Sequence, residues 1–323
     1  MATAIKKIKI KKRQDGKVGF LIGFLDKSVD ATYIIHKLGN GRLDQVRKQL
    51  QLYQPTQTIY LVQTPGWKEK NAKKKNKHIC DTARDIVDNN IHVFRHAKKH
   101  NYANILILED DFFFKDTVLD VSVNGEINAF LKKNQDTVMC YTVGCIPFIS
   151  APCFDVINFP VFWERKGERT AKRNRILGFP LHYYTAFATT HCCIYTRPYR
   201  DKLLTKGDTY LKAIKDWDNE IIFGTMYHEP LCYQLFPETE NQNGWGKSGA
   251  LIHIAISFAK QLIKIIQLDK KPEPGYMITY LFSKLLFFNL LLFLAFFLGI
   301  LLVLLKVDLT FLVPRFPPLY VVE

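Results

Sequence analysis

An uncharged apolar segment near the C-terminal end constrains the fold most strongly. It reads LLFFNLLLFLAFFLGILLVLL over 285–305. As a helix it is long enough to cross a hydrocarbon core of about 30 Å. A helix of a water-soluble domain is rarely apolar on every side over such a length. We therefore expect one transmembrane helix at 285–305, a short tail at 306–323, and a folded domain before the span.

The N-terminal sequence MATAIKKIKIKKRQ is charged and lacks the apolar core of a signal peptide. We therefore expect the span to act as a single-pass, C-terminal anchor in a membrane. Lys270, Lys271 and Lys284 precede the span, and Lys306 and Arg315 follow it. This slight basic bias upstream predicts that the large domain lies on the cytosolic side.

The net charge of +15 is concentrated in clusters at 6–13, 68–77 and 165–175. Such clusters either bind anionic partners or form solvated loops. We interpret 1–17 as a basic tail. Over 250–268 the polar residues recur at helical spacing and form one narrow stripe. This pattern predicts an amphipathic juxtamembrane helix that lies in the membrane interface or packs on the domain.

Strand-like and helix-like segments alternate within the expected domain at 18–247. Alternation of this kind is typical of a parallel sheet with helices on its faces. The third strand is apolar without alternation, which indicates that both of its faces are covered. The sequence predicts an α/β fold with a mixed, mostly parallel sheet flanked by helices, and an irregular region at 147–180. The expected strands are 31–38, 58–63, 103–108, 138–144 and 190–196, and the first two helices are 43–53 and 81–97.

Three carboxylates, Glu109, Asp110 and Asp111, follow the third strand directly. Ligands of open α/β sheets gather beyond the carboxyl ends of the strands. Alternate residues of an extended chain face the same way, so Glu109 and Asp111 can converge. Adjacent carboxylates repel each other, and Mg²⁺ or Mn²⁺ shared with phosphates relieves the repulsion. The motif predicts a metal–diphosphate site, and the alternative is an acidic surface turn.

Several segments together resemble one enzyme family. NYANILILEDDFFF, preceded by NIHVFRHAKKH, is similar to the central motif of family 25 glycosyltransferases, the lipopolysaccharide-type and collagen-galactosyltransferase-like enzymes. YIIHKLGNGRLDQVRKQL resembles their opening strand and helix, and THCCIYTRPYRDKLL resembles their Gly-Thr-His-Ala segment. DWDNEI and EPLCYQLFPETENQNGW resemble the closing part, and the latter also resembles enzymes of large DNA viruses. The resemblance covers roughly 31–247.

The sequence departs from the family pattern at one place in that range. It has Thr189 where the family has glycine, and Cys192 where alanine is usual. The membrane span is an addition to the simplest form of the family.

The resemblance implies a GT-A fold and transfer of a sugar from a nucleotide-sugar donor, expected to be a UDP-sugar. The acceptor would be a hydroxyl of a glycan, glycolipid or glycoprotein. It implies Mn²⁺ or Mg²⁺ held by Asp111, with Glu109 or Asp110 as a second ligand or as a contact to the ribose of the donor. His191 and His228 are possible further metal ligands, and a structural role is the alternative for each.

Arginine suits phosphate geometry, so Arg42 and Arg84 are candidate donor-binding residues, with surface ion pairing as the alternative. Asp216 and Asp218 are the candidate catalytic bases if the transfer inverts the anomeric centre. Trp217 lies between them and could stack on a sugar. The alternative interpretation of these two aspartates is a helix N-terminus with acidic residues in its first turn.

Two other functions fit parts of the sequence. One is a catalytically inactive, tail-anchored scaffold of the same fold. The other is a metal-dependent nucleotidyltransferase or nuclease, in which the acidic residues would act on phosphodiesters. In the leading interpretation we do not expect nucleic acid as a partner.

Overall fold

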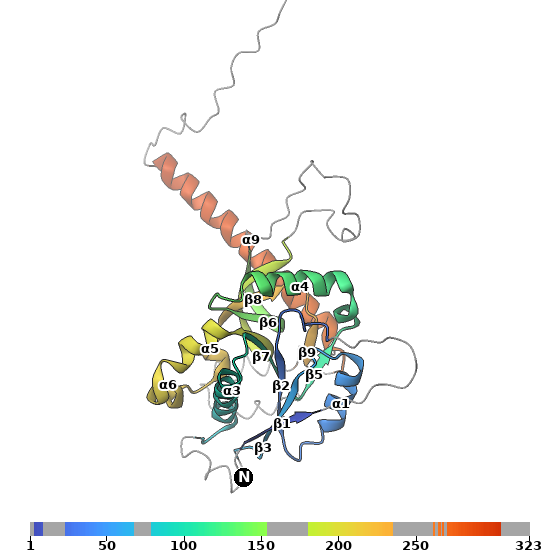
Figure 1. Ribbon diagram of the computed structural model, residues 1–323. Coiled ribbons are helices and arrows are strands. Elements are labelled where there is room, and N and C mark those ends of the chain that lie inside the picture. The colour runs from blue at the N-terminus through green and yellow to red at the C-terminus, as the bar shows by residue number, and fades with distance from the viewer. Residues whose placement is uncertain are drawn as a thin grey trace, which may run out of the picture.

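A seven-stranded mixed sheet forms the centre of the protein, with helices on both faces and one long helix extending beyond the domain (Figure 1). This confirms the mixed α/β class. The computed structural model describes residues 3–8, 23–67, 79–153, 180–234 and 270–304, and a few single positions between 261 and 267.

The order of the strands in the large sheet is β1-β3-β2-β4-β7-β6-β8, and β5 and β9 form a separate antiparallel pair. The strands are β1 Ala4–Ile8, β2 Ala31–Lys37, β3 Ile59–Thr64, β4 Asn104–Glu109, β5 Phe112–Phe114, β6 Cys140–Pro152, β7 His182–Thr196, β8 Phe223–Tyr227 and β9 Cys232–Gln234. The helices are α1 Leu43–Leu52, α3 Thr82–Lys99, the 3-10 helix η1 Asp116–Leu119, α4 Val121–Lys133, α5 Arg197–Leu204, α6 Gly207–Ala213, α7 Trp217–Glu220 and α9 Pro272–Leu304.

Strand β2 pairs in parallel with β3 on one side and with β4 on the other. The chain therefore runs outward from β2 to β3 and then crosses back to β4. Such a reversal of strand order leaves a crevice at the carboxyl ends of the two strands that flank it. In this protein the reversal lies between β2 and β4, so ligand binding is expected where these strands end, and β7 borders β4 in the antiparallel direction.

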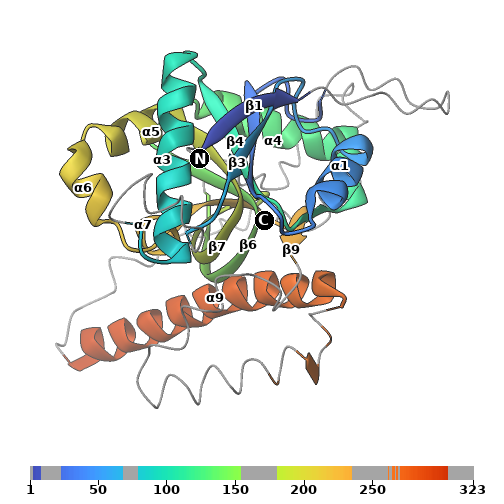
Figure 2. The ribbon, with the colours of Figure 1, turned by 90° about the horizontal axis from the view of Figure 1, so that it is seen from below.

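Both faces of the central strands are buried, as the apolar run of β4 predicted. Ile105 and Ile107 pack in the core beneath α3, α5, α6 and α7. Leu106 and Leu108 pack in the core beneath α1 and α4. The view in Figure 2 shows α3, α5 and α6 on one side of the sheet and α1 on the other.

Part of the segment 1–17, which we predicted to be a basic tail, is a strand. Ala4–Ile8 form β1, which pairs antiparallel with β3 at the edge of the sheet. Ile5 and Ile8 pack against the two cores, and Lys6 and Lys7 between them are exposed. Residues 9–17 lie outside the described residues.

Strands β6 and β7 are longer than we predicted. Strand β6 continues to Pro152, within the region expected to be irregular, and β7 begins at His182, just after that region. Pro147 lies beside a register shift in the pairing of β6 with β7. Such an irregularity accommodates a proline in a strand. Residues 154–179 are outside the described residues.

Helix α9 begins well before the expected span and is partly a domain helix. Buried Tyr276, Tyr280 and Ser283 face the sheet. The hydroxyl of Ser150 in β6 donates to Oγ of Ser283 at 2.8 Å. The first turns of α9, which lie beyond the predicted domain end at 247, therefore pack on the sheet and contribute to the core.

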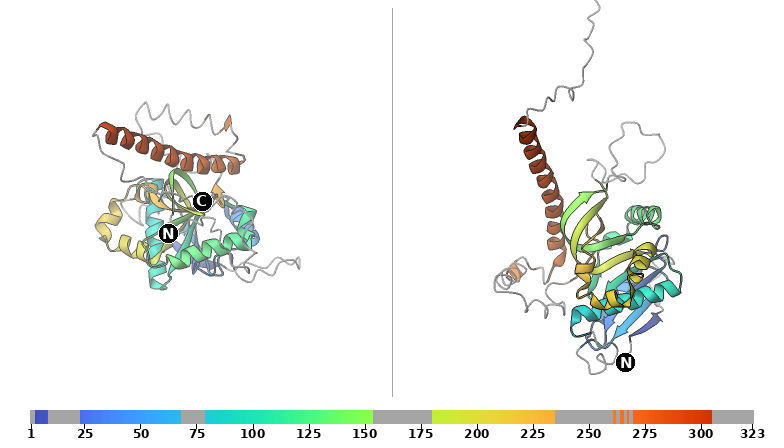
Figure 3. Two further views of the ribbon diagram at one scale, coloured as in Figure 1. Left: turned by 90° about the horizontal axis from the view of Figure 1, so that it is seen from above. Right: turned by 90° about the vertical axis from the view of Figure 1, so that its left-hand side faces the viewer.

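The rest of α9 projects from the domain (Figure 3). Within the described residues it is the one helix that by length and composition can cross a membrane, over Pro272–Leu298, and its most apolar 18-residue window has a mean hydropathy of 2.3. Most of the amphipathic helix expected at 250–268, and the tail at 306–323, lie outside the described residues.

Candidate active site at the carboxyl ends of β2 and β4

The Glu-Asp-Asp motif lies at the carboxyl end of β4, beside β2. Glu109 is the last residue of β4, and it pairs with Ile35 of β2. The chain leaves β2 through a turn in which Gly39 and Gly41 both have φ of +78°. Glycine adopts this conformation without strain. The turn brings the loop between β2 and α1 against the motif.

Asp110 is fixed by donors from this loop. Its Oδ2 lies 2.7 Å from Nδ1 of His36 and accepts from Nδ2 of Asn40 at 2.6 Å and from the N–H of Lys37 at 3.2 Å. Its Oδ1 accepts from Nη1 of Arg42 at 3.1 Å. Burial by itself would raise the pKa of Asp110, but these hydrogen bonds and the guanidinium charge bring the pKa below its ordinary value. Both oxygens are thus engaged within the protein. This favours a role for Asp110 in positioning the loop. It does not favour the predicted contact of Asp110 with the nucleotide-sugar donor.

Arg42 connects the two aspartates of the motif. The same Nη1 atom lies 3.3 Å from Oδ2 of Asp111. We predicted that Arg42 contacts the phosphates of a donor, and the structure shows it as an ion-pair partner of Asp110 and Asp111. Its side chain remains partly exposed.

Glu109 lies among other carboxylates. Burial, followed by the charges of Asp111, Asp218 and Asp110, raises the pKa of Glu109 well above its usual range. Asp218 comes from α7, far along the chain, so the fold brings it to the motif. We call Glu109, Asp111 and Asp218 the carboxylate cluster. Repulsion within it is relieved by a proton or by a bound cation.

Strand β7 holds Asp218 in place. Its carboxylate accepts from the N–H of Thr189 at 3.1 Å and from the hydroxyl of Thr190 at 2.9 Å. Burial raises the pKa of Asp218 above its ordinary value, although the hydroxyl of Thr190 opposes this. Thr189 has φ of +69°, a conformation that favours glycine. Thr189 occupies the position at which the sequence pattern of family 25 glycosyltransferases has glycine.

Asp216 caps helix α7, and Trp217 is buried in the core. Oδ1 of Asp216 accepts from the N–H of Asp218 at 2.9 Å and caps α7, as the alternative interpretation predicted. Trp217 is only 2% exposed. Its Nε1 donates to the hydroxyl of Tyr195 at 3.1 Å, and its ring packs against Phe94. The prediction that Trp217 stacks on a sugar is therefore wrong.

The two histidines have different surroundings. His191 is buried, and the edge of its ring meets Tyr276 of α9. Burial lowers the pKa of His191 to about 4, so the imidazole is neutral near pH 7. Burial and the charges of Lys284 and Lys115 lower the pKa of His228 to about 4. These cations make the surroundings of His228 unfavourable for a metal ion.

Arg84 lies at the start of α3. Its N–H donates to Oδ1 of Asp81, which caps the helix, and its Nη1 lies 3.2 Å from Sγ of Cys80. The residue lines a cavity of about 80 Å³ together with Asp208 and Lys212 of α6. This places Arg84 against α6 and does not support the predicted contact with the donor.

The carboxylate oxygens of the cluster could supply some of the ligands of a divalent cation, but not all of them. Within the described ranges no group of three or more histidine, cysteine, aspartate or glutamate side chains is arranged to hold a metal ion. Mg²⁺ sites commonly use one or two carboxylates and take the remaining oxygens from phosphates and water. Asp111 and Glu109, whose repulsion a cation would relieve, match that arrangement.

Sequence reasoning missed His36, Asn40 and Thr190 as parts of the site. His36 and Asn40 belong to the segment that follows the strand next to Glu109, and this position was the available signal. A scan of the chain against protein-family models finds no match. A search of curated proteins finds none either.

Proposed function

We propose that the protein is a membrane-anchored, metal-dependent glycosyltransferase of the GT-A type. It would move a sugar from a nucleotide-sugar donor, expected to be a UDP-sugar, to a hydroxyl acceptor. The main support is the carboxylate cluster at the carboxyl ends of β2 and β4. Burial and the neighbouring carboxylates raise the pKa of Glu109, while Asp110 beside it is held by hydrogen bonds from the loop after β2.

Each residue has a definite part in this proposal. Asp111 and Glu109 would hold Mn²⁺ or Mg²⁺ together with the donor diphosphate. That ion, when bound, neutralises charge on the departing nucleoside diphosphate. Asp110 fixes the loop that carries Arg42, whose guanidinium faces the phosphates. Asp218, whose pKa is raised, would take the proton of the acceptor hydroxyl.

The packing of α9 supports a membrane-bound acceptor, a glycolipid or a glycoprotein. The ring of Tyr276 in α9 contacts the ring of His191. The backbone N–H of Gln234 in β9 donates to the hydroxyl of Tyr276 at 3.4 Å. The site and the start of α9 are therefore parts of one packed unit. A site held in this way is close to acceptors in the same membrane, which raises their local concentration. From the lysines that precede the span we propose that the domain faces the cytosol.

The test uses the full chain in lipid nanodiscs, supplied with Mn²⁺ and a panel of UDP- and GDP-sugars. Release of free nucleoside diphosphate is measured with and without a membrane extract as the source of acceptor. We expect release from one donor and a loss of about a hundredfold or more in Asp111→Asn. Asp44→Asn is the control, because Asp44 is an exposed residue of α1. Release by Asp111→Asn at the wild-type rate would contradict the proposal.

One observation favours a second candidate, a catalytically inactive binding protein of the same fold. Arg42 already neutralises Asp110 and Asp111 without a metal ion. In that case the chain would bind a nucleoside diphosphate weakly or not at all and would release none from any donor.

A further inference from the structure

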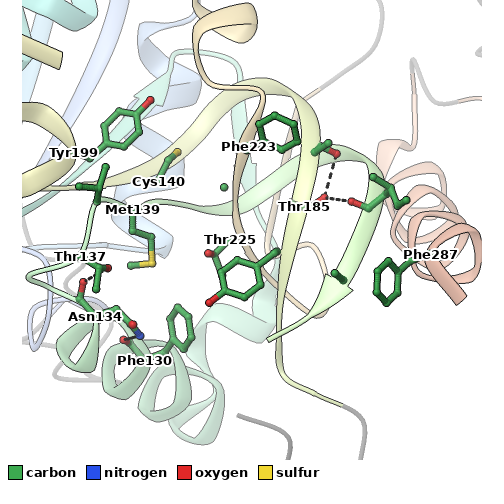
Figure 4. A pocket seen from close by; sticks show the side chains of 16 residues that line it. Phe130, Asn134, Thr137, Met139, Cys140, Thr185, Tyr199, Phe223, Thr225 and Phe287 are labelled. Carbon is green, nitrogen blue, oxygen red and sulfur yellow. Dashed lines mark hydrogen bonds between the residues drawn. The ribbon is translucent and has the colours of Figure 1, made fainter. Parts of the chain in front are cut away.

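A second cavity lies apart from the carboxylate cluster, between the end of α4, the strands β6–β8 and α9 (Figure 4). Its volume is about 550 Å³. Pockets for small ligands span about 300–1,000 Å³. Most of the large side chains that line it are apolar or aromatic, namely Phe130, Met139, Ile149, Tyr184, Phe223 and Phe287. We call this cavity the α9 groove.

The α9 groove is continuous with the surface that the candidate transmembrane helix offers to lipid. Phe287 lines the groove and belongs to the apolar part of α9. Its neighbours Leu286 and Phe288 are exposed. At the rim of the groove Phe223 is 75% exposed and Tyr184 is 57% exposed. Large apolar side chains gathered on a surface mark contact with another apolar phase. In this protein the candidate span of α9 points to a bilayer as that phase.

Three polar side chains that line the groove, those of Asn134, Thr137 and Thr185, hydrogen-bond within the protein. The hydroxyl of Thr185 donates to the carbonyl of Ile149 at 3.0 Å and accepts from Ser150 at 3.0 Å. The side chains of Asn134 and Thr137 donate to carbonyls of α4 and its C-terminal end. Among the described residues that line the groove none is charged. The chemistry of the groove therefore matches a hydrocarbon chain and leaves any charged head group outside.

We propose that the α9 groove binds one hydrocarbon chain of a membrane lipid, which enters from the bilayer beside Phe287. The occupant is a lipid because the open side of the groove is shared with the membrane helix. This inference does not depend on sugar transfer. If the protein is a glycosyltransferase, the groove gives a lipid-linked acceptor a place for its chain.

The test is photo-crosslinking of the full chain in phosphatidylcholine nanodiscs that contain phosphatidylcholine with a diazirine in its acyl chain. After irradiation and digestion, mass spectrometry locates the labelled peptides. We expect label on β7 near 184–186 and on β8 near 223–225, in addition to label on α9. Ala151→Trp fills the groove and removes contact worth at least two methylene groups, so label on β7 and β8 should fall about tenfold.

Val121→Trp is the matched control, because Val121 is 79% exposed at the start of α4 and does not line the groove. Phe223→Asp places a charge on an exposed rim residue without disturbing the core, so it should also lower the label if Ala151→Trp fails to fold. Thermal unfolding checks each variant. Label confined to α9, or label on β7 and β8 that both variants leave unchanged, would overturn the proposal. A groove filled by another segment of the chain would give the first of these results.

Discussion

The N–H of Thr189 donates a hydrogen bond to Oδ2 of Asp218 across 3.1 Å, and Thr189 does so from a φ of +69°. A β-branched residue rarely adopts this conformation. Such strain is retained when the surrounding structure determines the backbone more strongly than the residue does. Here the adjacent Thr190 also binds Asp218. The placement of a carboxylate of the candidate site therefore depends on a strained position in β7.

Thr189→Gly should stabilise the protein by about 1 kcal/mol, because glycine removes the left-handed strain at a smaller cost in chain entropy. It also removes a buried hydroxyl that has no hydrogen-bond partner among the residues that the structure describes. Thr189→Ala, which keeps the Cβ atom, should not give the gain from relieved strain. Urea denaturation of the full chain in detergent micelles measures both variants. If Thr189→Gly is less stable than Thr189→Ala, strain at this position is not significant.

Substitutions of the adjacent residues Asp110 and Asp111 should have different effects, the first on stability and the second on nucleotide binding. Asp110→Asn should cost about 3 kcal/mol of unfolding free energy, because it breaks the ion pair of the buried carboxylate with Arg42 and disturbs hydrogen bonds from His36 and Asn40. Asp111→Asn should cost less stability and should abolish metal-dependent binding of nucleotide. The two quantities are measured by denaturation and by calorimetric titration. Equal losses of stability in both variants would contradict the positioning role of Asp110.

Gly144→Ala should destabilise the protein by about 3 kcal/mol or more, because overpacking here involves rigid backbone. A Cβ atom at Gly144 would lie 2.0 Å from the carbonyl oxygen of Cys232 in β9. Gly125→Ala in α4 is the matched control, since nothing lies within 4 Å of its Cβ position. It should raise stability by up to about 1 kcal/mol through helix propensity. Similar effects of the two substitutions would contradict the close approach of β6 and β9.

Acidification should unfold the protein in part through His182. Burial and the nearby His228 lower the pKa of His182 to about 3, whereas an unfolded histidine titrates near 6.5. Between these values the unfolded state binds more protons, so stability falls as the pH falls, by at most about 1.4 kcal/mol per pH unit from this group. His182→Gln should reduce the slope of unfolding free energy against pH between about 6 and 4. An unchanged slope would show that His182 is protonated in the folded state.

The sequence predicted the centre of the fold well because the central strands and helices have strong local patterns. The run from Ile105 to Leu108 indicated a strand buried on both faces, and the structure confirms it. The acidic motif was located correctly because it ends that strand. The network around Asp110 was not predicted, because its partners lie about seventy positions away and depend on the register of β2 against β4.

Other errors also have physical reasons. A single aromatic residue such as Trp217 gives no local indication of whether it is buried. The docking of α9 was missed because the long apolar run dominated its interpretation. Tyr276, Tyr280 and Ser283 nevertheless recur at helical spacing, and they mark the face that packs on the sheet. The same residues show why the full chain, and not a fragment ending at 247, is the right material for experiments.

The most direct test of a metal–diphosphate site is calorimetric titration of UDP and GDP into the full chain in nanodiscs. The titrations are run with Mn²⁺ and with EDTA, on wild type and on Asp111→Asn, with Asp44→Asn as the control. Our account predicts that one nucleotide binds wild type and Asp44→Asn only with Mn²⁺, and that Asp111→Asn does not bind it. A folded wild-type protein that binds neither nucleotide with Mn²⁺ or Mg²⁺ would contradict the account.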